Sequence, residues 1–257
     1  MKKLLNIFPK LKTYSILSLM NRLHILKEKK NILFRRSWAQ FLRGDANEAL
    51  ETARECLELQ EKYENRSDIA YTLQVLGAIC MGKGEYTLAL DYTSRSVTIF
   101  EEIGDKMGLG TSLGILGSIS YMEGKLNQAV KYCKQSLSFK MISNRVKADN
   151  LNILGQVYSN RGEINKALGY YKKGIVIAEK ANVYDVFIRF QIAIGSIFLL
   201  KGEYDLAIEY LEPSLSLAEK INDAFGIVLS LIYLGMIYIE NEFFLVYYTF
   251  IINRLKK

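Results

Sequence analysis

Few side chains in this sequence are of the types and at the spacings that catalysis requires. His24 is the one histidine of the chain, so no Ser/His/Asp or Cys/His set can be assembled around it. The segment Gly77–Gly84, GAICMGKG, nearly matches a phosphate-binding loop, but Gly84 stands where Ser or Thr would hold Mg²⁺ and no strand pattern precedes it. Gly108-Leu109-Gly110 lacks the third glycine of a dinucleotide-binding fingerprint. We therefore expect no catalytic residue and no cofactor.

Cysteines and carboxylates do not form a metal or disulfide pattern. Cys56, Cys80 and Cys133 are far apart in the sequence and have no close pairing, which argues against a disulfide framework. No His, Cys, Asp and Glu residues cluster at the spacing of metal ligands. We expect the cysteines to be small buried residues of a reducing, cytoplasmic protein, and we expect no metal site.

Glycine recurs along the chain at a nearly fixed interval. One series is spaced by 40, 40, 38 and 40 residues: Gly44, Gly84, Gly124, Gly162 and Gly202. A second series is spaced by 40, 38, 40 and 40 residues: Gly77, Gly117, Gly155, Gly195 and Gly235. Two series that share one deletion indicate a tandem repeat with the period of a solenoid.

Each repeat has the pattern of two helices. Leu73, Leu76 and Ile79 show the apolar spacing of a first helix, and the turn glycine that follows suits a positive φ. A small residue recurs early in the second helix, where two helices would approach closely: Ala49, Ala89, Ala129, Ala167 and Ala207. A second small residue recurs seven positions later: Cys56, Ser96, Ser136, Gly174 and Ser214.

These features resemble the tetratricopeptide repeat, in a variety with a 40-residue period. The resemblance rests on the aliphatic-Gly pair such as Leu154-Gly155, Tyr158 three residues after that glycine, the turn glycine and the small alanine. It implies an all-α, right-handed superhelical solenoid of about six tandem antiparallel helix hairpins. Only two prolines in 257 residues also favour an all-helical chain.

The repeat pattern divides the chain as follows. Residues 1–30 are a basic N-terminal arm or capping helix, and residues 31–257 are the solenoid. We place the repeats at about 31–66, 67–105, 106–143, 144–184 and 185–223, with an incomplete or atypical last repeat at 224–257. Ser67 and Asp185 are candidate N-caps, and Pro213 is expected to kink its helix.

The net charge of +7 is concentrated at the N-terminus. Residues 1–43 hold eleven Lys or Arg and one acidic residue, whereas the remainder is slightly acidic. This arm packs as a capping helix, contacts nucleic acid or an anionic membrane, or is disordered. No apolar run is long enough to span a membrane, and no small-residue cleavage site follows Met1–Phe8. The near-neutral repeats argue against a general nucleic-acid binder.

The C-terminal segment FFLVYYTFII, residues 243–252, is apolar on every side. It predicts self-association through the C-terminal helix, a partner that covers this end, or a continuation of the chain. The residues of this expected association surface are Phe243, Phe244, Val246, Tyr247, Phe250 and Ile251.

The resemblance implies a concave groove lined by the first helices, which binds a protein or peptide partner. Carried onto this sequence, the groove residues are Tyr71, Gln74, Met81, Ser118, Tyr121, Asp149, Asn152, Gln156, Asn160, Arg189 and Ser196. Arg189 is nearly alone among them as a cation, so no basic clamp for a carboxylate is expected. We expect a non-catalytic interaction scaffold. The alternative is a sensor or regulatory arm of a transcriptional or signalling system, in which the basic N-terminal arm contacts nucleic acid or membrane.

Overall fold

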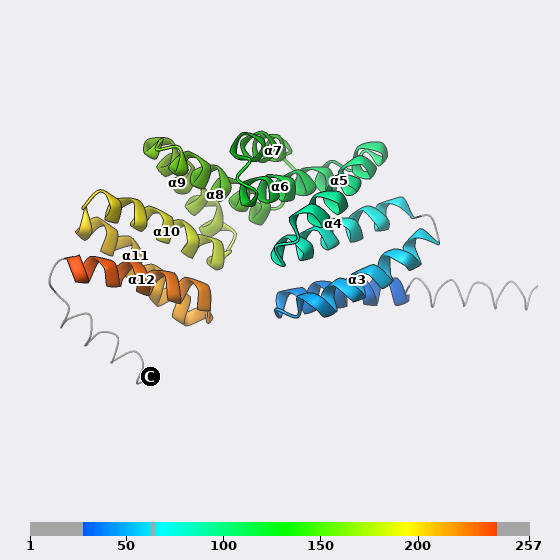
Figure 1. Ribbon diagram of the computed structural model, residues 1–257, viewed down its shortest axis with the longest axis horizontal. Coiled ribbons are helices and arrows are strands. Elements are labelled where there is room, and N and C mark those ends of the chain that lie inside the picture. Colours follow the sequence, from blue (N-terminus) through cyan, green and yellow to red (C-terminus); the bar gives the residue numbers. More distant parts are fainter. Residues whose placement is uncertain (1–27, 63–64, 241–257) are drawn as a thin grey trace, which may run out of the picture. The chain divides into compact units, whose positions relative to one another are not determined.

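In the computed structural model, the described residues are 28–62 and 65–240, and they form helices joined by short turns, with no strand among them (Figure 1). After a helix over residues 28–42, the elements are α3 (Ala46–Glu61), α4 (Arg66–Gly82), α5 (Tyr86–Ile103), α6 (Lys106–Met122), α7 (Leu126–Ser138), α8 (Asn144–Asn160), α9 (Ile164–Lys180), α10 (Tyr184–Leu200), α11 (Tyr204–Ile221) and α12 (Ala224–Glu240). The predicted all-α repeat solenoid is confirmed.

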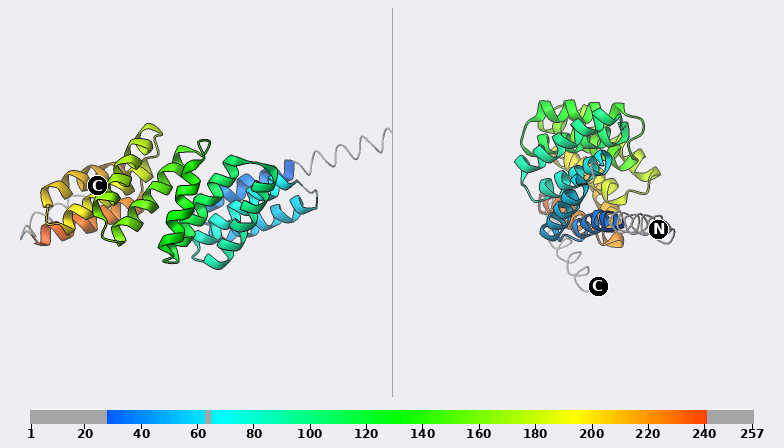
Figure 2. Two further views of the ribbon diagram at one scale, coloured as in Figure 1. Left: turned by 90° about the horizontal axis from the view of Figure 1, so that it is seen from above. Right: turned by 90° about the vertical axis from the view of Figure 1, so that its right-hand side faces the viewer.

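The chain divides into two units, Met1–Ile115 and Leu116–Lys257, with the boundary inside α6. In the first unit, α4 packs against α3 and α5. In the second unit, each helix from α8 to α12 packs against the next, and α10 also contacts α8 and α12 (Figures 1 and 2). First helices therefore contact the first helices of neighbouring repeats as well as their own hairpin partners.

The turn inside each hairpin requires its glycine. Gly84, between α4 and α5, has φ +78°, a conformation in which a Cβ would be strained. Its N–H donates to the carbonyl of Met81 at 3.0 Å, and the next N–H, of Glu85, donates to Cys80 at 2.9 Å. These bonds satisfy carbonyls at the end of α4. The other turn glycines of the predicted series also have positive φ, so this part of the prediction is confirmed.

The helix glycines are explained by a contact within each hairpin. A Cβ on Gly117 would lie 2.5 Å from Cys133 Sγ, and one on Gly155 would lie 2.2 Å from the ring of Tyr171. The residue that fills this space comes four positions after the recurring alanine, which is itself fully buried in every copy. Glycine on the first helix thus makes room for a side chain of the second helix.

The second small series joins each repeat to the next. Ser96 Oγ lies 2.8 Å from Ser112 Oγ, and Ser214 Oγ lies 2.8 Å from Ser230 Oγ, sixteen residues later in both pairs. The corresponding contact of Cys56 is with Thr72 at 3.8 Å, and that of Ser136 is with Asn150, whose Nδ2 donates at 2.7 Å.

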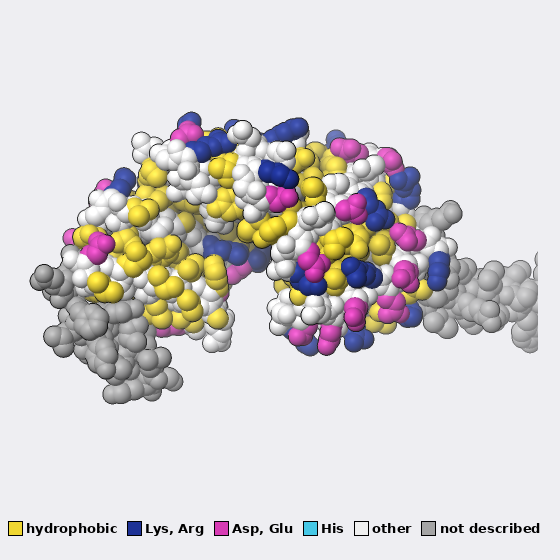
Figure 3. Space-filling model, in the orientation of Figure 1, with side chains coloured by type: hydrophobic (Ala, Val, Ile, Leu, Met, Phe, Trp, Pro, Cys, Tyr) yellow, Lys and Arg dark blue, Asp and Glu magenta, His cyan; other side chains and the backbone are white. Residues whose placement is uncertain are grey.

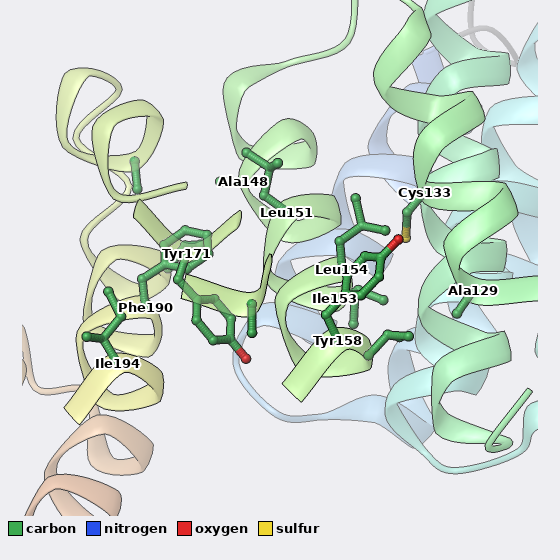
Figure 4. Packing of buried hydrophobic residues seen from close by; sticks show 14 of the residues in the cluster. Ala129, Cys133, Ala148, Leu151, Ile153, Leu154, Tyr158, Tyr171, Phe190 and Ile194 are labelled. Atoms are coloured by element: carbon green, nitrogen blue, oxygen red, sulfur yellow. The ribbon is translucent and has the colours of Figure 1, made fainter. Parts of the chain in front are cut away.

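In the copy at Gly174 this polar contact is replaced by an apolar one. A Cβ on Gly174 would lie 2.0 Å from Cζ of Phe190, a residue that is fully buried. Figure 4 shows Phe190 with Tyr171 and Ile194 in the core of the second unit. The missing side chain at position 174 therefore accommodates an aromatic ring from the following repeat.

Two local expectations are wrong. The N-cap of α4 is Asn65, whose side chain accepts a hydrogen bond from the N–H of Asp68, and Ser67 lies in the first turn. Helix α10 begins at Tyr184 after Val183, which provides no side-chain cap. Asp185 lies in the first turn of α10 and is engaged by arginines instead.

Two further local features concern the second helices. Helix α11 continues through the exposed Pro213. Helix α7 has 13 residues, and the other second helices from α3 to α11 have 16 to 18. This early end of α7 is the structural form of the two-residue deletion in the repeat.

Candidate functional site

Helices α8 and α10 present polar side chains on the same face of the second unit. Asp149, Gln156 and Asn160 of α8 follow one another at the spacing of a helix face. Arg189 and Ser196 of α10 stand 40 residues after the first two. We define the α8–α10 face as the residues at these positions and at the preceding turn: Arg145, Asp149, Gln156, Asn160, Asp185, Arg189 and Ser196.

Four charged side chains of this face form one network. Arg145 donates to both carboxylate oxygens of Asp185, at 3.1 and 2.6 Å, and Arg189 donates to Asp185 at 3.0 Å. Both arginines also approach Asp149, at 3.8 and 3.9 Å. The network has no net charge, and because its side chains are 35 to 53% exposed, it contributes little to stability. Its position favours recognition over folding.

The network changes the expectation for Arg189. The sequence indicated a nearly isolated cation, but Arg189 is paired with two carboxylates and lies in one network with Arg145. The surrounding protein raises the pKa of Asp149 by desolvation, whereas Arg145 and Arg189 act to lower it. Sequence analysis missed Arg145 and Asp185. The signal was present, because a 40-residue offset puts Arg145 opposite Asp185 and Asp149 opposite Arg189.

Asn152 has an unused acceptor at the edge of this face. Its Oδ1 is buried and has no hydrogen-bond partner within the described residues. In the first unit, the equivalent residue is Gln74, whose Nε2 donates to Ser112 Oγ at 2.8 Å and to the carbonyl of Gly108 at 3.1 Å. In the repeat register, Phe190 occupies on α10 the position of Ser112 on α6. The hydroxyl partner is therefore absent beside Asn152.

Other predicted groove residues differ in what their side chains already contact. Asn160 Nδ2 donates to the Tyr121 hydroxyl at 3.4 Å, and Ser196 Oγ donates to the carbonyl of Ala193 at 2.9 Å. Gln156 is half-buried, and no hydrogen bond of its side chain occurs within residues 28–62 and 65–240. Ser118 on α6 is half-buried and has a contact of its own. Gln156 is therefore the most available amide of the α8–α10 face.

The predicted residues of the first unit serve to join α4 and α6. The Tyr71 hydroxyl donates to Asp105 at 2.7 Å, and burial together with this bond raises the pKa of Tyr71 to about 12. Gln74 crosses to α6 as described above, and Met81 is half-buried at the end of α4. The structure thus places Tyr71, Gln74 and Met81 in the first unit and the remaining predicted groove residues in the second.

The predicted association residues, between Phe243 and Ile251, lie outside the described residues, as does most of the basic arm. In its described part, Lys29 pairs with Glu55 at 2.8 Å, and Lys30 pairs with Asp68 at 3.5 Å. These two cations are therefore engaged with the first unit.

The described residues offer little to other kinds of site. Between residues 28 and 240, apart from the undescribed 63–64, no three His, Cys, Asp or Glu side chains are grouped to hold a metal ion. No helix in the same part of the chain is long and apolar enough to cross a membrane. The segment Gly77–Gly84 forms the end of α4 and its turn, so its two glycines have structural roles.

Comparison with known proteins agrees with this architecture. Tetratricopeptide repeat family models match residues 149–185 and 188–221. Together with the hairpins described above, these matches identify the chain as a tetratricopeptide repeat protein. Repeats of this family generally serve as non-catalytic scaffolds for protein–protein interaction. No curated protein sequence matches the chain.

Solved structures show the same fold at low identity. Aspartyl phosphate phosphatase F from Bacillus subtilis is 14% identical with a TM-score of 0.70, and the match covers 88% of this chain and 60% of that one. The apo form of RapI is 20% identical with a TM-score of 0.62, covering 84% of both chains. The tetratricopeptide-like repeats of a kinesin light chain from Podosopora anserina are 16% identical with a TM-score of 0.56, covering 76% of this chain and 96% of that one.

Proposed function

We propose that this protein is a non-catalytic interaction scaffold that binds an extended segment of a partner protein on the α8–α10 face. The observation that carries the proposal is the contrast between the two units. Gln74 of the first unit uses its amide to join two helices, whereas Asn152 retains an unused acceptor and Gln156 an uncommitted amide. Amide groups both donate and accept, which suits the alternating groups of a peptide backbone.

The charges of the face add selectivity to this proposal. Arg145 and Arg189 are neutralised by Asp149 and Asp185, so a strongly charged ligand would meet no net attraction. A partner with one carboxylate could exchange with Asp149, whose contacts with both arginines are the longest in the network. We expect the bound segment to be extended and mainly polar, with few charges.

The test is a comparison of affinities for peptides selected on the full chain from a random display library. Replacing Asn152, Gln156 and Asn160 together by Ala should weaken the selected peptides at least about tenfold, because each lost hydrogen bond costs about 0.5–1.5 kcal/mol. The matched control replaces three exposed polar residues of α9 by Ala: Asn165, Lys172 and Lys173. Equal affinities for both variants and the wild type would sink the assignment of the face.

The alternative function, a sensor or regulatory arm, gives a different result. Binding of DNA or anionic vesicles through residues 1–43 would fall steeply with salt and would survive the triple substitution on α8. Titration with each of these ligands at two salt concentrations distinguishes the two functions.

A further inference from the structure

Helix α12 exposes an apolar stripe on one side. With the exposed fractions of the residues, the stripe consists of Phe225 (60%), Val228 (54%), Ile232 (50%), Met236 (44%) and Ile239 (60%). Their spacings of three and four residues put them on one face, which we call the α12 face. Hydrophobic side chains gather over α12 in Figure 3. The helix has one charged residue, Glu240, at its end.

The preceding repeat shows what such a face contacts. Forty residues earlier on α10, the equivalents of Val228, Ile232 and Ile239 are Ile188, Ile192 and Leu199. These three are 0, 4 and 6% exposed, because α11 and α12 pack against them. A Cβ on Gly226 of α12 would lie 2.9 Å from Ile188. This side of a first helix is therefore shaped to receive another first helix.

The spacing of the stripe indicates which helix would fit. Val228 and Met236 each lie four residues from Ile232, and Phe225 and Ile239 each lie seven residues from it. The stripe is thus symmetric about Ile232. Two antiparallel copies related by a two-fold axis would pair Phe225 with Ile239, Val228 with Met236, and Ile232 with itself. We propose that the α12 face binds the α12 face of a second copy of this chain, as an isologous dimer.

Charge and area agree with a reversible dimer. No charged side chain lies within the stripe, so the two copies meet without repulsion. Five half-exposed side chains of about 100 Å² each from both copies would bury about 1,000 Å² in total, near the lower limit of a specific interface. We expect a dissociation constant in the micromolar range. The proposal does not rest on the α8–α10 face and stands if that assignment fails.

Sedimentation velocity of the full chain over a range of concentrations tests the proposal. The wild type should show a monomer–dimer equilibrium. Ile232→Arg should weaken dimerisation at least about tenfold, since two unpaired guanidinium groups would meet at the axis. Val176→Arg is the matched control, because Val176 is 48% exposed on α9 and lies outside the α12 face. It should dimerise as the wild type does, and circular dichroism should show that both variants are folded.

A charge-exchange experiment tests the symmetry itself. Val228→Glu and Met236→Lys should each weaken the dimer, whereas the double variant should recover much of it, because every Glu then faces a Lys of the other copy. A wild-type chain that stays monomeric at all concentrations would overturn the proposal. A dimer insensitive to Ile232→Arg, or a double variant no better than its parents, would overturn it equally.

Discussion

Gly174 of α9 provides a quantitative test of how the repeats are joined. A Cβ at this position would lie 2.0 Å from Cζ and 2.4 and 2.5 Å from two further atoms of the Phe190 ring. Ordinary carbon contacts are about 3.5–4.0 Å, so the ring would have to move by roughly 1.5 Å. Phe190 is fully buried, and its ring centroid is 6.1 Å from that of Tyr171. The ring therefore has little room to move.

The same helix supplies the control. Gly169 has no atom within 4 Å of its would-be Cβ. Both Gly→Ala changes gain the same helix propensity, about 0.5–1 kcal/mol, so this gain cancels when the variants are compared. Gly169→Ala should stabilise the protein. Gly174→Ala should be less stable than Gly169→Ala by the cost of overpacking, about 1–3 kcal/mol, and at the upper part of this range because the obstructing ring is buried.

Urea unfolding at neutral pH, at one protein concentration, measures this difference. The double variant Gly174→Ala/Phe190→Leu should recover part of the loss, since a smaller side chain then faces the new methyl group. A difference below about 0.5 kcal/mol between the two single variants, which is within the usual range of surface substitutions, would refute the argument. It would mean that the contact between α9 and α10 is loose.

Three further predictions concern single residues. Asp105→Ala should lower the free energy of unfolding by about 1–2 kcal/mol at pH 7, because the carboxylate caps α6 and accepts from Tyr71. Partial burial raises the pKa of Asp105, but its three hydrogen bonds outweigh this and hold the pKa below its usual value. Its contribution is therefore complete above the unfolded pKa of about 3.9 and is lost as the pH falls through the folded pKa, which urea unfolding at pH 7 and pH 3 would show. Pro213→Ala should raise the midpoint of thermal unfolding, because it restores a backbone donor inside α11; an unchanged midpoint would contradict this. Burial raises the pKa of the Cys133 thiol to about 12, so a thiol reagent at pH 8 should label Cys133 only in the unfolded protein, as peptide mass spectrometry would show.

Much of the fold could be predicted from the sequence because its constraints are local. A turn that needs positive φ selects glycine, and a close helix contact selects alanine, so Gly84 and Ala89 mark a hairpin without knowledge of the rest of the chain. The N-caps were less predictable, since several polar residues precede each helix. Asn65 lies only two residues before Ser67, and the choice depends on where the preceding turn ends.

The candidate site was harder to predict because it depends on contacts between repeats. The pairing of Arg145 with Asp185 follows from the 40-residue register only when first helices are known to lie side by side. The unused acceptor of Asn152 depends on Phe190 standing opposite it, which in turn requires Gly174. Residue types alone indicated a polar face, whereas the availability of each group required the packing of its neighbours.

Site-specific photo-cross-linking tests the central proposal, binding at the α8–α10 face, most directly. A photoreactive amino acid would be placed at Gln156 of α8 or at Lys172 on the exposed side of α9, and each protein would be irradiated with a selected peptide. The proposal predicts cross-linked peptide at Gln156 and none above background at Lys172, with competition by unlabelled peptide. Equal cross-linking at both positions, or cross-linking at Lys172 alone, would contradict it.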